Sequence, residues 1–152
     1  MDLQHLRWTK NVKPNDKPWA YEEFKVGQLF KLAWKDNETN AGKPQKDDLI
    51  LLRQNGYVTH LVRVLDDSPG KETRGGDYSI YRIIETLWAE DCTNSSQSAK
   101  AEVVFKYSVN YQGGDVMELE NLPTFKQRWD NDNGLQGFQS HVQGLLALSN
   151  SG

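Results

Sequence analysis

Short stretches rich in aliphatic and aromatic residues alternate along this chain with polar loops, which is the pattern of a mostly β protein. Two of them, residues 48–53 (DLILLR) and 57–65 (YVTHLVRVL), are separated by Gln54-Asn55-Gly56. Asn-Gly supplies the positive φ that a tight turn requires, so a β-hairpin is predicted there. Further strands are predicted over residues 28–34, 78–90, 101–111 and 116–119.

The second strand of the hairpin is apolar on both sides. Alternation places Val58, His60, Val62 and Val64 on one face, while Leu61 points to the other. A strand of this kind packs against other parts of the protein on both faces, as happens when a sheet curls into a barrel and other elements pack outside it.

The two ends of the chain differ from this pattern. Residues 1–20 are predicted to form an irregular arm because of Pro14 and Pro18, and to dock on the body because Trp8 and Trp19 would otherwise expose apolar surface. Residues 135–148 carry an apolar stripe at helical spacing after DNDNG, which offers capping side chains, so a closing helix is expected. A shorter helical turn is expected over residues 122–129. The predicted fold class is α+β, mostly β: a small β-barrel with flanking helices and a C-terminal helix, in a single domain over residues 1–152.

Composition limits the size of the core, the possible cysteine chemistry and the expected location of the protein. A chain of 152 residues can close one sizeable hydrophobic core. Cys92 is the only cysteine, so no intrachain disulfide and no thiolate zinc site can form, and a reducing, cytoplasmic location is expected. No stretch approaches the roughly 18 apolar residues of a membrane span, so no membrane association is expected.

Charge argues against coating of nucleic acid through bulk electrostatics alone, because the net charge is −3. The distribution is uneven. Residues 1–46 hold nine Lys/Arg against six Asp/Glu, and residues 47–152 hold nine against fifteen. The basic excess at the start is either an ordinary solvated surface or a set of phosphate contacts.

No complete catalytic constellation is present, so the chain is expected not to be an enzyme and to use no cofactor or metal. The phosphate-loop, dinucleotide and G-x-S-x-G motifs are absent, and His5, His60 and His141 are widely scattered. Glu23-Phe24-Lys25 has the E-x-K spacing of metal-dependent nucleases but lacks the upstream aspartate on a strand. Cys92 is expected to be an idle thiol.

The five tryptophans and His60 leave two interpretations open. The indoles are either core packing or, for two or three of them, the lining of a ligand cleft. His60 is either a hydrogen-bonded core histidine or a polar group at a pocket wall.

The hairpin segment KPQKDDLILLRQNGYVTHLVRVLDD resembles PUA-like domains, especially the EVE branch. In that branch "K-x-G-D" opens a strand and the next strand carries a pattern such as "V-x-H-V-V-x-V". Lys46-Asp47-Asp48 stands at the first motif and residues 58–64 at the second, while Arg7-Trp8 and Trp88 sit where the barrel would continue. The resemblance implies a cleft that accepts an extruded, often modified, base between aromatic side chains. The G-x-K-x-x-E-x-R signature of the related ASCH domains is absent.

The leading hypothesis is a non-catalytic nucleic-acid-binding module, for DNA or RNA, that reads a modified or unpaired base. The ligand-binding candidates are Trp8, Trp34, Trp88, Tyr57, His60 and Arg63, and the phosphate-contact candidates are Arg7, Lys10 and Lys13. Because His60 and Arg63 project from opposite faces of one strand, at most one can point into a given cleft. One alternative is a protein-interaction or dimerising scaffold domain, with a homodimer built on exposed aromatic residues. A second is a small-molecule or nucleotide-binding barrel.

Overall fold

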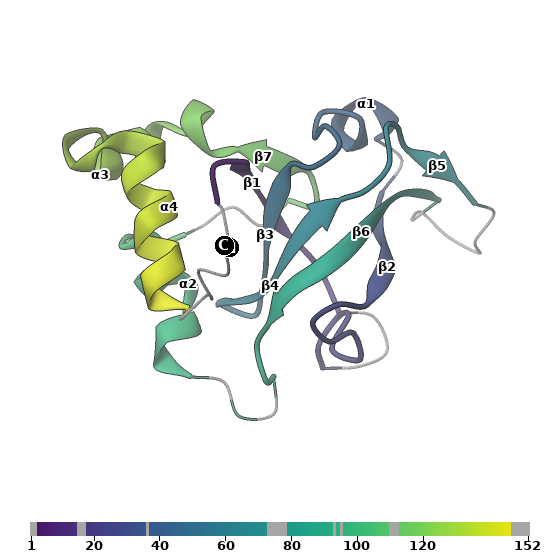
Figure 1. The fold of residues 1–152 in the computed structure, drawn as a ribbon, viewed down its shortest axis with the longest axis horizontal. Helices are drawn as coiled ribbons and strands as arrows, with labels where there is room; N and C mark the ends of the chain where they lie inside the picture. Colours follow the sequence, from purple (N-terminus) through teal and green to yellow (C-terminus); the bar gives the residue numbers. More distant parts are fainter. Residues whose placement is uncertain are drawn as a thin grey trace.

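A computed structural model describes residues 3–14, 18–35, 37–72, 79–92, 94, 96–109 and 113–146. Its strands form one curled mixed sheet of half-barrel shape, in the order β2-β6-β4-β3-β1-β7, with β5 paired to β6 (Figure 1). The strands are β1 (Leu6–Asn11), β2 (Leu29–Trp34), β3 (Leu49–Gln54), β4 (Tyr57–Val64), β5 (Gly70–Lys71), β6 (Ile80–Ala89) and β7 (Val116–Glu118). The helices are α1 (Glu38–Ala41), α2 (Ala101–Phe105), α3 (Pro123–Trp129) and α4 (Gly134–Leu145), with 3-10 turns at 97–99, 119–121 and 130–132. The predicted α+β class is confirmed.

The hairpin predicted around Asn-Gly is confirmed. Asn55 has φ 52° and Gly56 has φ 81°, the two positive values of a type I′ turn. Strand β4 is buried at every position except Tyr57 and Arg63, so the expectation that this strand is covered on both faces is also confirmed. Strands β2 and β6 lie within the predicted ranges 28–34 and 78–90, although Tyr78 is outside the described residues.

A β-bulge changes which face one hairpin residue occupies. Val58 pairs with Arg53 and His60 pairs with Leu52, so Thr59 is an extra residue in β4. The prediction that Val58 shares a face with His60 is wrong, because the bulge turns Val58 toward the helices. Further register shifts occur between Leu6 and Trp8 in the pairing of β1 with β3 and between Leu61 and Val62 in the pairing of β4 with β6.

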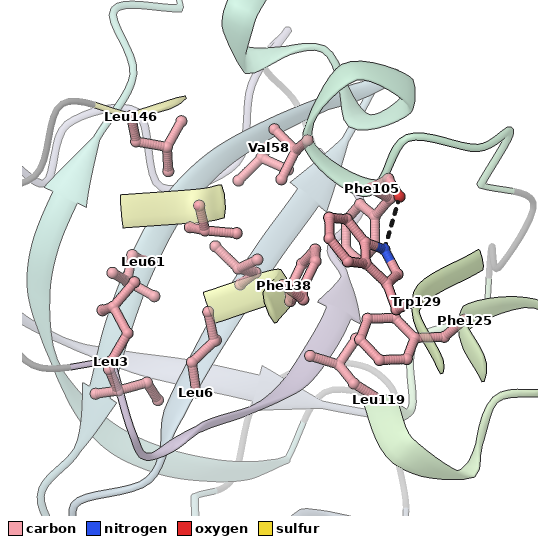
Figure 2. Packing of buried hydrophobic residues seen from close by; sticks show 14 residues of the cluster. Leu3, Leu6, Val58, Leu61, Phe105, Leu119, Phe125, Trp129, Phe138 and Leu146 are labelled. Carbon is pink, nitrogen blue, oxygen red and sulfur yellow. Dashed lines mark hydrogen bonds between the residues drawn. The ribbon is translucent and has the colours of Figure 1, made fainter. Parts of the chain in front are cut away.

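The sheet has a core on each side. The helix-side core joins the sheet to α2, α3 and α4, which Figure 1 shows together on one side of it. Figure 2 labels ten of its members: Leu3, Leu6, Val58, Leu61, Phe105, Leu119, Phe125, Trp129, Phe138 and Leu146. The inner core fills the concave side and includes Trp8, Phe30, Leu32, Trp34, Ile50, Leu52, Val62, Val64, Ile80 and Ile84. Strand β3 serves both cores through alternate side chains.

The N-terminal segment is not an irregular arm throughout. Residues 6–11 form β1, which runs parallel to β3 and antiparallel to β7. Trp8 is 7% exposed, so the expectation that its indole docks on the body is confirmed. The strand was missed because its pairing with β3 is non-local and a buried lysine, Lys10, interrupts its apolar alternation. Residues 15–17 are outside the described residues.

The C-terminal half contains one wrong prediction and two confirmed ones. Residues 101–111 were expected to be a strand, but residues 101–105 form α2, with Ala101, Val104 and Phe105 buried at helical spacing. Accordingly, β7 pairs with β1 and not with this segment. Both α3 and α4 occupy the predicted positions, but no side chain caps α4.

A buried amide bridges the two ends of the strand order. The Asn40 Oδ1 accepts hydrogen bonds from Trp34 Nε1 at 2.8 Å and from the Val116 backbone N at 2.7 Å. The Asn40 Nδ2 donates to the Val116 carbonyl at 3.0 Å. Trp34 ends β2 and Val116 begins β7, so one side chain links the two edge strands of the half-barrel.

Replacing this amide should loosen the sheet. We expect Asn40→Ala to lower the free energy of unfolding by about 2–4 kcal/mol, since each buried polar group left without a partner costs roughly 1–3 kcal/mol. Urea denaturation measures the change. Asn131→Ala removes an exposed amide from the turn after α3 and should stay within about 0.5 kcal/mol of the parent. Equal stability of the two variants would contradict the bridging role.

Candidate ligand groove at the hairpin tip

A groove of about 400 Å³ lies where the tip of the β3–β4 hairpin meets the start of α2. The residues that line it come from three segments: Asn55, Gly56 and Tyr57 from the hairpin, Lys100, Ala101 and Glu102 from the helix start, and Ser108 and Val109 beyond α2. We call it the hairpin-tip groove. Its volume is within the range of small-ligand sites, roughly 300–1,000 Å³.

Backbone hydrogen bonds fix two of these segments to each other. The Ala101 N donates to the Gly56 carbonyl at 2.8 Å. Next to this bond, Tyr57 and Lys100 form an isolated antiparallel bridge. The hairpin turn and the start of α2 are therefore held in register, and a ligand would meet a wall that is already formed.

Tyr57 supplies the aromatic surface of the groove. The residue is half-buried, and its ring lies edge-on to Trp19, with centroids 6.0 Å apart and an interplanar angle of 72°. The Asn55 Nδ2 donates to the Pro18 carbonyl at 3.0 Å, which keeps the segment carrying Trp19 against the hairpin. Of the ligand-binding candidates predicted from sequence, Tyr57 is the one that lines this groove.

A chain of buried hydrogen bonds also holds the segment that carries Trp19 against the hairpin. Gln54 accepts from the Ala20 N at 2.6 Å and donates through Nε2 to the Ala20 carbonyl and to Thr59 Oγ1. His60 Nε2 lies 3.0 Å from the Tyr21 carbonyl, which can only accept, so Nε2 carries the ring proton. Nδ1 then accepts from the Thr59 hydroxyl at 2.9 Å.

His60 is accordingly a core residue with both ring nitrogens engaged. It is 1% exposed and lies edge-on to the rings of Tyr21 and Phe30. Burial lowers the pKa of its imidazole to about 4, which outweighs the opposing hydrogen bond to the Tyr21 carbonyl. The ring is therefore neutral at physiological pH, and His60 is not among the residues that line the hairpin-tip groove.

The three tryptophans predicted as cleft residues do not meet in one place. Trp8 and Trp34 belong to the inner core, where their Nε1 atoms donate to Asp48 at 2.9 Å and to Asn40 at 2.8 Å. Trp88 is half-buried in β6 and packs against the helix-side core. Their indole rings therefore contribute to two different cores.

The predicted polar and basic residues are also dispersed. Arg63 pairs with Glu85 across β4 and β6 at 2.5 Å. Arg7 and Lys13 are exposed near β1, whereas Lys10 is 2% exposed and its Nζ lies 4.9 Å from the Trp34 ring centroid. Burial lowers the pKa of Lys10 to about 8, and Asp115 opposes that shift.

Other chemistry is sparse in the part of the chain that the structure describes. Within it, no three His, Cys, Asp or Glu side chains gather as a metal site would require, and no helix has the length and apolar character to cross a bilayer. Cys92 is half-buried in the turn after β6, and burial raises the pKa of its thiol.

Sequence reasoning missed the three polar residues that segment 100–109 contributes to the groove, Lys100, Glu102 and Ser108. Their neighbourhood depends on the bond between Gly56 and Ala101, which are 45 positions apart in the chain, and residues 101–111 were expected to be a strand. The one available signal was the apolar spacing of Ala101, Val104 and Phe105, which also fits a helix.

The burial of His60 predicts a specific loss of stability in mild acid. Its folded pKa of about 4 lies below the ordinary histidine pKa of 6.5, so the unfolded chain takes up the proton first and stability falls as the pH drops from about 6.5 towards 4. Because one pKa unit corresponds to roughly 1.36 kcal/mol, we expect a loss of about 2 kcal/mol between pH 7 and pH 5.

Urea denaturation at the two pH values measures this effect. The variant His60→Gln should lose much less stability between pH 7 and pH 5 than the parent protein. The variant His5→Gln removes an exposed imidazole and should keep the parent's pH dependence. A His60→Gln variant with the full dependence would show that another group is responsible.

Comparison of the chain with protein-family models, with curated proteins and with solved structures finds no match in any of the three.

Proposed function

We propose that this chain is a non-catalytic nucleic-acid-binding module of PUA-like barrel type, and that it takes an unpaired or modified base into the hairpin-tip groove. The observation that carries the proposal is a preformed groove of about 400 Å³ in which a half-buried tyrosine ring stands beside hydrogen-bonding groups. Single-stranded nucleic acids are recognised through this combination of stacking and base-edge contacts.

The groove residues fit these roles by chemical type. Tyr57 offers a ring face for stacking. Glu102 accepts from exocyclic amines, Ser108 both donates and accepts, and Lys100 donates to base carbonyls or phosphate. In this assignment the base stacks on Tyr57 at the hairpin tip. The indoles of Trp8, Trp34 and Trp88, which were also candidates from the sequence, do not take part.

The net charge of −3 is compatible with this mode of binding. Stacking contributes roughly 1–3 kcal/mol per base and does not depend on a large basic surface. Affinity for a short single strand should therefore be moderate and should depend less on salt than that of a protein making many phosphate contacts.

Removal of the tyrosine ring tests the proposal. We expect Tyr57→Ala to weaken binding of fluorescently labelled single-stranded oligonucleotides, DNA and RNA, plain and base-modified, by about 5- to 150-fold, the loss of roughly 1–3 kcal/mol of stacking. Fluorescence anisotropy measures the affinity. Tyr57→Phe should retain most of the binding, because it keeps the ring.

Tyr81→Ala is the matched control, since Tyr81 is a half-buried tyrosine of β6 that lies outside the groove lining. If none of the oligonucleotides binds the parent protein, or if Tyr57→Ala binds as well as Tyr81→Ala, base capture in this groove is wrong.

A second candidate function, self-association, is favoured by one exposed surface. Val26 is 65% exposed, Leu29 55% and Ile83 37%. Leu29 and Lys31 pair with Glu85 and Ile83, so Leu29 and Ile83 lie on the same outward face of β2 and β6. Strand β2 ends the strand order, and an exposed apolar edge pairs readily with a second copy of the same strand.

Light scattering tests this second candidate. A dimer built on the β2 edge should dissociate in Leu29→Glu, because the substitution places a charge in an apolar interface while changing a residue that is 55% exposed in the monomer. A parent protein that is monomeric at high micromolar concentration would rule this candidate out.

A further inference from the structure

Trp129 of α3 has three polar side chains gathered around its ring. The residue is 3% exposed, and its Nε1 donates to the Phe105 carbonyl at 3.0 Å, as Figure 2 shows. The Lys106 Nζ lies 5.7 Å from the ring centroid and the Arg128 Cζ lies 4.6 Å from it. The ring of His141 is 5.4 Å away, centroid to centroid.

The three side chains come from three different elements. Lys106 follows α2 in the left-handed conformation with φ 63°, Arg128 is in α3, and His141 is in α4. The His141 Nε2 is 3.4 Å from the carbonyl of Val103, which can only accept, so Nε2 carries the proton. Nδ1 is then the basic atom of the ring.

The electrostatic balance at this cluster is positive. Lys106 and Arg128 both lower the pKa of His141, although burial is the larger cause, and the carbonyls of Val103 and Val104 act in the opposite direction. One acidic side chain, Asp132, pairs with Arg128 Nη1 at 2.6 Å and engages one arm of the guanidinium. An anion bound here would offset the repulsion that the two cations impose on a protonated His141.

Lys106 of the cluster lies close to the hairpin-tip groove along the chain. Lys106 precedes the groove residue Ser108 by two positions, so their Cα atoms are at most about 7 Å apart. A nucleotide carries its phosphate a short distance from its base. A ligand with its base in the groove would therefore bring a phosphate close to Lys106.

We propose that Lys106, Arg128 and His141 form a phosphate-binding site beside the hairpin-tip groove, which we call the phosphate cluster. Lysine contributes a point charge, arginine its remaining N–H donors, and His141 takes up a proton from solvent at Nδ1 as the anion binds. The inference rests on the proposed function in one respect, namely that the phosphate belongs to a nucleic-acid strand whose base enters the groove.

The salt dependence of binding tests the role of the two cations. In the double variant Lys106→Gln/Arg128→Gln, the slope of log K against log salt for a single-stranded oligonucleotide should become shallower by about 0.7, because the site holds one phosphate and each lost phosphate contact contributes roughly 0.7. Tyr57→Ala should lower affinity and leave the slope unchanged. This contrast separates a phosphate contact from a base contact.

A matched control comes from the same helix. Lys126→Gln removes an exposed positive charge of α3 and should leave the slope unchanged. The Lys106→Gln substitution keeps an unbranched side chain at the left-handed position, so the backbone cost does not change. Oligonucleotide binding with an unchanged slope in the double variant would overturn the phosphate cluster and leave the proposed function standing.

A second measurement does not depend on oligonucleotide binding. In the parent protein, inorganic phosphate at millimolar concentration should shift the NMR resonances of the His141 ring and raise its pKa, and it should do neither in the double variant. His5, whose side chain is exposed elsewhere, is the internal reference. If no oligonucleotide binds but His141 responds to phosphate, the site exists and the base-reading function is wrong. No response at His141 overturns the phosphate cluster.

Discussion

The half-barrel depends on one buried side-chain amide. Strands β2 and β7 end the strand order, and Asn40 connects them through bonds to Trp34 and to both backbone groups of Val116. A second buried group fixes the segment that carries this amide, because Arg82 donates to the carbonyls of Ala41 and Pro44 while its Nε pairs with Asp66. Neither polar group could be buried without these partners, so each fixes a single arrangement of the chain.

This link between the edge strands also determines what occupies the concave side of the sheet. With the edge strands linked, the concave side of the sheet is filled by packed side chains, and the indoles of Trp8 and Trp34 are enclosed together with Lys10. These groups give the sheet its shape. The groove in which we propose ligand binding lies at the periphery, between the hairpin tip and the start of α2.

The parts of the fold that depend on neighbouring residues could be predicted from the sequence. The parts that depend on contacts between distant segments could not. The Asn55-Gly56 turn could be predicted because its backbone conformation depends on those two residues alone. Strand β1 could not, since its parallel pairing with β3 joins segments some forty positions apart and places Lys10 in the interior. Residues 101–109 satisfied both an alternating and a helical pattern, and only contacts of Val104 and Phe105 with the helix-side core decide between them. The groove could not be predicted for the same reason, because half of its lining comes from this segment.

The register of the hairpin also explains why its tip can serve as a rigid wall. The bulge at Thr59 turns Val58 into the helix-side core, so the strand is anchored by apolar packing on that side immediately after the turn. On the other side, Gln54 and His60 hold the backbone of Ala20 and Tyr21 through buried hydrogen bonds. The turn is thus fixed from both faces before any ligand arrives. A wall ordered in this way would lose little conformational entropy if a ligand bound, so in the proposed site the modest energy of stacking on one tyrosine would appear as affinity.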